Sequence, residues 1–180
     1  MTMKRALCAV RDTLAELADT VRELGVAIDD CPAPGGDLAV VEALRAHAAD
    51  VDGDAGETAA AAAAALEAEE AGDCNRAARM LADAHERFSG LARRVRFDLS
   101  GRATLFEVER LPERRGARWR SWSEVVLRQL EQIDHAVHGA DTAFIGCWQE
   151  LIDRGPAVSI TTTQNVGVAP QVQQKQPAAM

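Results

Sequence analysis

The polar cluster at residues 131–138 carries the residue types that most often bind metal ions. On a helix, four of its side chains would fall on neighbouring turns: Glu131, Asp134, His135 and His138. Di-metal carboxylate bundles take a Glu-x-x-His pair from each of two helices. In this chain the residue three positions before His135 is Gln132 and not a glutamate, so the motif is missing. The polar residues at 83–86 contain no Glu-x-x-His pair either. The sequence therefore favours solvated polar residues over a metal site and predicts no cofactor.

Nucleophilic and phosphate-binding patterns are also absent from the sequence. The four cysteines are widely spaced and form no C-x-x-C pair: Cys8, Cys31, Cys74 and Cys147. We expect Cys8 and Cys147 to be packing thiols, because they lie beside or on apolar helix positions. Gly53-x-x-Gly56 lacks the Lys-Ser or Lys-Thr of a phosphate loop, and the acidic run at 50–57 lacks the Gly and Glu of a calcium loop. We expect no catalysis by this chain.

The charges divide along the sequence. Residues 1–75 carry sixteen acidic and five basic side chains, residues 76–120 carry six acidic and twelve basic ones, and the whole chain has a net charge of -8. Such a balance disfavours nucleic acid as a partner and predicts that the two segments face each other in one domain. Because arginine and tryptophan often anchor protein contacts, the exposed part of the segment around Trp119, Arg120 and Trp122 is a candidate interface.

Length and composition predict one domain with a thin core. The chain has 180 residues, and 35 of its hydrophobic residues are alanine. It has seven Trp and Phe residues and no Tyr, which disfavours an aromatic-lined pocket. No apolar run approaches the roughly 18 residues of a membrane span, so we expect a soluble, cytoplasmic protein with reduced thiols.

Apolar residues at alternating spacings of three and four predict long helices. The first seam consists of Leu7, Val10, Leu14, Leu17, Val21, Leu24 and Ile28. A second helix is expected from Asp37 to about Val51, then a turn at 50–57 with Asp54 as the next N-cap, and an alanine-rich helix from Glu57 to about Ala71.

The C-terminal half continues the pattern with two further seams. The first runs from Ala77 to Val95 and closes at Ser100-Gly101. Residues 105–111 fit a helix or a short strand that Pro112 would stop, and 113–120 reads as an arginine-rich loop. A capping box at 121–124 is expected to open the longest helix, in which Gly139 and Gly146 allow either close helix approach or a kink. Gly155-Pro156 would end it.

These elements predict an all-α bundle of four to five long amphipathic helices over residues 1–154. Residues 155–180 are expected to form a flexible or β-prone tail that is either disordered or pairs with a partner's sheet edge. The seams can pair within one chain or between copies, so a self-associating coiled coil stays open.

Residues 119–167 resemble a bacterial family of CATRA-associated small proteins. The resemblance rests on Cys147-Trp148-Gln149-Glu150-Leu151 at the end of a long helix, followed by the Ser/Thr/Val segment at 158–167. It implies an accessory protein of bacterial conflict or immunity systems, without catalysis of its own. Such a protein would act beside larger CATRA-domain proteins that often carry caspase-like or other peptidase domains. The resemblance makes Trp148 and Glu150 structural or interface candidates.

We therefore expect a non-enzymatic adaptor or regulatory accessory protein that binds a larger multidomain partner. The expected contact residues are Trp119, Arg120, Trp122, Trp148, Glu150, Ile160 and Thr162. The alternatives are a metal-binding bundle that uses the cluster at 131–138 and a self-associating protein. Neither a membrane nor a nucleic acid is expected as a partner.

Overall fold

The computed structural model describes residues 2–32 and 38–155, and these residues are almost entirely helical. The elements are α1 (Met3–Asp29), α2 (Leu38–Glu70), α3 (Cys74–Arg94), the π-helical segment η1 (Val95–Leu99), α4 (Arg102–Arg115) and α5 (Ala117–Asp153). No strand occurs in these two ranges, so the all-α prediction is confirmed. Ile160, Thr162 and the rest of the expected tail after Gly155 lie outside the described residues.

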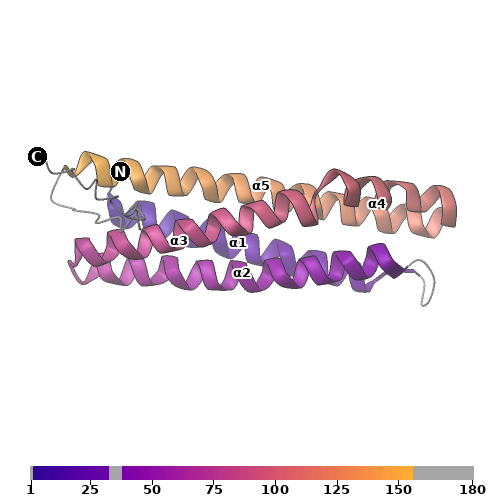
Figure 1. Cartoon of the computed structure of the whole chain (residues 1–180), viewed down its shortest axis with the longest axis horizontal. Coiled ribbons are helices and arrows are strands. Elements are labelled where there is room, and N and C mark those ends of the chain that lie inside the picture. Colours follow the sequence, from indigo (N-terminus) through magenta and orange to yellow (C-terminus); the bar gives the residue numbers. More distant parts are fainter. Residues whose placement is uncertain (1, 33–37, 156–180) are drawn as a thin grey trace, which may run out of the picture.

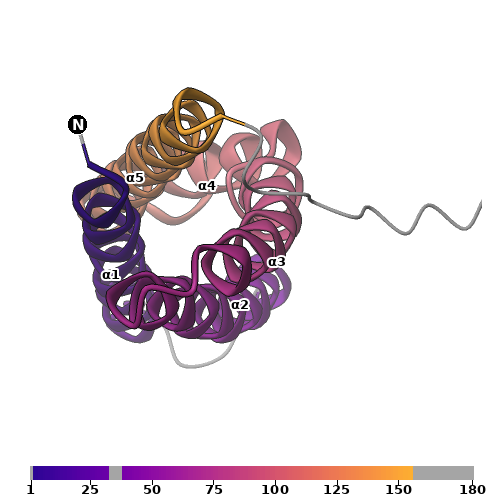
Figure 2. The same ribbon diagram turned by 90° about the vertical axis from the view of Figure 1, so that its left-hand side faces the viewer.

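The helices form an elongated bundle with four sides (Figure 1). α1 packs between α2 and α5, α2 packs against α3, and α4 packs against the first half of α5. In chain order α3, η1 and α4 follow one another along one side, and α5 returns along the whole length of the bundle (Figure 1); Figure 2 shows the same bundle from one end. Neighbouring sides run antiparallel, as short connections require.

The predicted apolar seams form the core. All seven seam residues of α1 are at most 1% exposed, and the seam of α3 from Ala77 to Val95 is buried as well. Apart from Ala77, these seam residues belong to one hydrophobic cluster with the buried stripe of α5. Each seam is therefore covered by helices of the same chain, and a second copy is not needed to bury it.

α2 is one helix, so the predicted turn at 50–57 is wrong. Its buried face continues through the acidic segment at spacings of three and four: Val41, Leu44, Ala48, Val51, Ala55, Thr58, Ala62 and Ala65. Burial of this face and the helix propensity of the alanine run outweigh the cost of Gly53 and Gly56, which is about 1 kcal/mol each. Asp54 is not an N-cap but pairs with Arg94, with 3.1 Å between Oδ2 and Nε.

The junction between α4 and α5 also differs from the prediction. Residues 105–111 are helical, and Pro112 lies inside α4 instead of ending it. A break at Gly116, whose φ is +91°, replaces the expected loop, and α5 begins at Ala117. The predicted capping box at 121–124 is therefore inside a helix, because Trp119 and Trp122 extend the buried stripe of α5 toward its start.

Two helix ends are held by specific contacts. Gly72, with φ +76°, ends α2 in a Schellman arrangement, in which Asp73 N–H bonds to Ala68 O at 2.9 Å. The Arg154 guanidinium donates to both carboxylate oxygens of Glu69 at 2.6 and 3.1 Å and ties the end of α5 to the end of α2.

Of the two alternatives for Gly139, close helix approach is not found, since a Cβ built there would meet nothing within 4 Å. In the part of the chain that the structure describes, no helix is both long enough and apolar enough to cross a membrane.

Candidate functional site

Trp119 and Trp122 were expected near an exposed contact surface, but both rings lie inside the fold. They are 5% and 6% exposed and meet edge to face, with 5.4 Å between ring centroids. Trp122 Nε1 donates to Ala27 O at 2.8 Å. If α1 continued, Cys31 N–H would bond to Ala27 O. It bonds to Ile28 O instead, so the indole of Trp122 supplies the hydrogen bond that Ala27 O would otherwise lack. These tryptophans fasten α5 to α1 and are not exposed anchors.

Trp148 fills the space between α3 and α5. Its Nε1 donates to His85 Nδ1 at 3.2 Å. The ring centroids of His85 and Phe144 are 5.1 Å apart, and those of Phe144 and Phe88 are also 5.1 Å apart. This row of rings packs the two helices together, and Trp148 is half-buried within it.

The structure does not gather the predicted contact residues into one site. Arg120 is exposed on α5, whereas Glu150 is partly buried. Trp122 and Trp148 are 26 positions apart on α5, which separates them by roughly 40 Å.

The cluster at 131–138 lies on α5 with exposed side chains: Glu131, Asp134, His135 and His138. Over residues 2–32 and 38–155, no three His, Cys, Asp or Glu side chains are placed to hold a metal ion together. A resident metal at this cluster is therefore not supported by its geometry.

Cys147 is fully buried on α5. Burial, with a smaller contribution from Glu150, raises the pKa of its thiol to about 12. The thiol is therefore protonated at neutral pH, which suits the packing role expected from the sequence.

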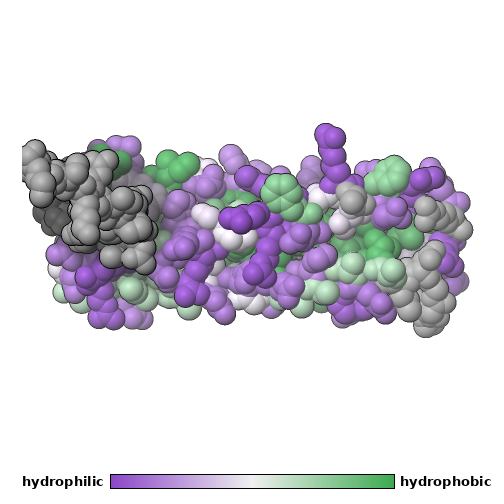
Figure 3. All heavy atoms as spheres, viewed as in Figure 1, coloured by the Kyte–Doolittle hydropathy of each residue, from purple (hydrophilic) through white to green (hydrophobic). Residues whose placement is uncertain are grey.

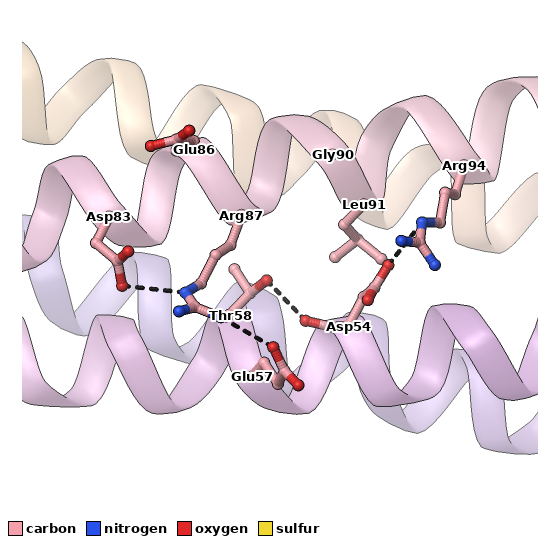
Figure 4. A pocket seen from close by; sticks show the side chains of 9 residues that line it. All are labelled: Asp54, Glu57, Thr58, Asp83, Glu86, Arg87, Gly90, Leu91 and Arg94. Carbon is pink, nitrogen blue, oxygen red and sulfur yellow. Dashed lines mark hydrogen bonds and ion pairs between the residues drawn. The ribbon is translucent and has the colours of Figure 1, made fainter.

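A hollow between α2 and α3 is lined by charged side chains, and all of them except Glu86 pair with one another (Figure 4). Arg87 donates to Asp83 at 3.0 Å and to Glu57 at 2.9 Å, and these contacts raise its pKa, the bond to Asp83 most. Arg94 pairs with Asp54 on the same side. The acidic α2 thus faces the basic α3, as the charge division predicted. The ion pairs Arg87–Glu57 and Arg94–Asp54 link the two helices.

The strongest candidate for a contact surface is the interruption between α3 and α4. In η1, Ser100 N–H bonds to Val95 O at 2.7 Å, five residues back. A Cβ at Gly101 would lie 2.3 Å from Phe97 O, so the tight exit from η1 requires glycine. Val95 and Leu99 stay in the core, whereas Phe97 turns outward and is 75% exposed. π-helical segments of this kind are frequent at functional sites.

A second phenylalanine is exposed on the adjoining helix. Phe106 of α4 is 51% exposed, and the guanidinium carbon of Arg110 lies 5.1 Å from its ring centroid. Arg96 and Arg102 are exposed on the same stretch of chain. The face shown in Figure 3 is mostly hydrophilic, with a hydrophobic area toward the right-hand end, beside α4. We call Phe97, Phe106 and these three arginines the η1–α4 surface.

Sequence reasoning missed Phe97 and Phe106, although a signal was present. Phe97 lies two residues after Val95 and is therefore off the stripe that runs from Ala77. An aromatic residue off the apolar stripe is either exposed or lies where the helical repeat changes. Phe97 is exposed and also lies in a π-helical segment.

Comparison of this chain with protein-family models, with curated proteins and with solved structures finds no match.

Proposed function

We propose that this chain is a non-enzymatic adaptor or regulatory accessory protein that binds a larger multidomain protein through the η1–α4 surface. The observation that carries the proposal is the exposure of Phe97 and Phe106, 75% and 51%, beside arginines; among the described residues these are the only exposed Phe or Trp side chains. Folding gains little from exposed aromatic rings, whereas aromatic residues and arginine are enriched at protein interfaces. A partner that covers the two rings buries apolar surface, which favours binding. Contacts with the arginines would fix the orientation of the partner.

The class of partner follows from the resemblance of residues 119–167 to CATRA-associated small proteins. On that basis the partner is a larger CATRA-domain protein, with a caspase-like or other peptidase domain, in a bacterial conflict system. The proposed place of action is the cytoplasm. Arg120, Glu150 and the tail with Ile160 and Thr162 are proposed as further contacts, and Trp148 contributes by holding α3 against α5.

Affinity capture from the native host tests this proposal with three forms of the chain. They are the full chain, a Phe97→Ser/Phe106→Ser variant, and a truncation after Gly155. The truncation keeps Gly155 because its N–H completes the end of α5 by bonding to Ile152 O at 3.0 Å. We expect the full chain to enrich one large multidomain protein and the serine variant to lose it. Equal recovery by the full chain and the serine variant, or no specific recovery by the full chain, contradicts the proposal.

Self-association is a second candidate function, and two residues of α5 favour it. Ile145 and Ile152 are 61% and 69% exposed and are seven positions apart, so they lie on one side of the helix. Light scattering of the full chain and of Ile145→Ser/Ile152→Ser tests it. A dimer that becomes a monomer in the variant supports self-association through this face, whereas a monomeric full chain excludes it.

A further inference from the structure

Two hollows lie along α5, on the side that faces α3, η1 and α4. They measure about 310 and 410 Å³, and Arg96 lines both. The α5 residues that line them follow one another from Leu127 to Asp141, a length of roughly 21 Å. We call these two neighbouring hollows together the α5 groove.

The floor of the groove is apolar, and part of it is open to solvent. Phe88, Leu130 and Val137 are at most 2% exposed and form its base. Leu105 and Leu127 are only partly buried, and the exposed Phe97 stands at its edge. A ligand in the groove would therefore cover one ring of the η1–α4 surface and two leucines.

The two walls carry opposite charges that do not pair with each other. Arg93 and Arg96 lie on the wall formed by α3 and η1, and Glu131, Asp134 and Asp141 lie on the α5 wall. Within the described parts of the chain, none of these five side chains forms an ion pair, although Arg87 and Arg94 on the side toward α2 both do. Farther along the first wall, α4 adds one carboxylate, Glu109, so the basic part of that wall is the part formed by α3 and η1. The groove thus separates two charged walls that a third element can bridge.

The shape favours a helix as that element. A strand would need an exposed sheet edge for its backbone hydrogen bonds, and residues 2–32 and 38–155 contain no strand. A helix satisfies its own backbone and needs only an apolar stripe and flanking charges. A groove of roughly 21 Å accommodates about fourteen helical residues.

We propose that the α5 groove binds an amphipathic helix of the partner. Its apolar stripe covers Leu105, Leu127 and Phe97, acidic side chains on one flank face Arg93 and Arg96, and basic side chains on the other flank face the carboxylates of α5. This inference rests on the proposed adaptor function and names the partner element that it requires.

Selection from a displayed library tests the groove directly. Helical peptides of about fifteen residues, randomised at apolar and flanking positions, are selected on the full chain. We expect enriched peptides to carry apolar residues three and four apart, with acids on one flank and bases on the other. Arg96→Glu and Leu127→Glu should weaken their binding about tenfold or more, whereas Val125→Glu, on an exposed part of α5 outside the groove, should not.

A charge exchange makes the test specific. An enriched peptide whose acidic flank is changed to lysine should lose binding to the natural chain and regain it with Arg93→Glu/Arg96→Glu. Both arginines are exposed, so these changes leave the core intact even if Leu127→Glu does not fold. Failure to enrich a helical pattern, or binding that is indifferent to Arg96 and Leu127, overturns the groove proposal. Partner capture that needs Phe106 but neither groove residue also overturns it while leaving the adaptor proposal standing.

Discussion

The Ser123 hydroxyl donates to the carbonyl oxygen of Val108 at 3.1 Å, and this is the carbonyl that Pro112 leaves without its helical partner. In a regular helix the N–H of residue 112 would bond to Val108 O, but proline has no N–H. Ser123 is 2% exposed, so the bond is shielded from water. The contact joins α4 to α5 beside the η1–α4 surface and explains how α4 contains a proline.

A double-mutant cycle tests this compensation. Ser123→Ala alone leaves a buried carbonyl unpaired and should lower the free energy of unfolding by about 1–3 kcal/mol. In a Pro112→Ala background the restored N–H serves Val108 O, so the same serine change should cost clearly less. Urea unfolding of the four proteins gives the coupling. Equal costs in the two backgrounds would show that Ser123 does not replace the missing donor.

Gly101→Ala should destabilise the protein, because the added Cβ would lie 2.3 Å from Phe97 O. The backbone carbonyl cannot move away without opening η1, and we expect a loss of about 1–3 kcal/mol. Gly90→Ala is the matched control, since a Cβ there meets nothing within 4 Å and alanine favours the helix by about 1 kcal/mol. In thermal unfolding, the Tm should fall for Gly101→Ala and rise for Gly90→Ala. A Gly101→Ala protein as stable as the natural chain would refute the steric account.

Trp122→Phe should remove the indole donor to Ala27 O while keeping most of the apolar ring. Since the bond is buried, we expect a loss of about 1–3 kcal/mol in denaturant unfolding. Arg120→Ala, two positions away and exposed, is the control and should change stability by at most about 0.5 kcal/mol. If both variants unfold at the same denaturant concentration, the indole bond does not hold α5 to α1.

Stability should fall at alkaline pH in a way that depends on Cys147. The thiol has a pKa of about 12 in the folded protein, above its ordinary value of 9.0, so the unfolded chain releases this proton first as the pH rises. The contribution of this thiol to the free energy of unfolding is complete below pH 9. It is lost between about pH 9 and 12, by at most about 1.4 kcal/mol per pH unit.

Cys147→Ala should therefore show a shallower decline than the natural chain above pH 9, although it is less stable at neutral pH. Cys74→Ala, which alters an exposed thiol, serves as control. Parallel pH profiles for the natural chain and Cys147→Ala would contradict a buried, protonated thiol.

Much of the fold follows from one physical signal, the spacing of apolar residues. The seams of α1 and α3 were predicted residue by residue, because burial selects apolar side chains three and four apart. Errors arose where local signals were given more weight than a seam that continued through them. Val51, Ala55 and Thr58 carry the seam of α2 across Gly53 and Gly56, and Trp119 carries that of α5 past the supposed cap.

The candidate surface was harder to predict, because it depends on features without a local signature. The outward turn of Phe97 results from a π-helical segment, and tolerance of Pro112 results from Ser123 on another helix. The sequence did indicate that residues 76–120 are rich in basic side chains, and it predicted a contact surface in the part around Trp119 and Trp122. The aromatic residues chosen there, Trp119 and Trp122, lie on the buried stripe, whereas Phe97 and Phe106 are exposed.

The affinity of the captured partner for purified variants tests the central claim most directly. Phe97→Ser/Phe106→Ser and Ile145→Ser/Ile152→Ser each replace two exposed apolar side chains, so neither pair removes core packing. If the η1–α4 surface is the contact, titration calorimetry should show a Kd raised about tenfold or more for the first pair and unchanged for the second. A Kd that is unchanged for the first pair, at full helicity, would contradict the account.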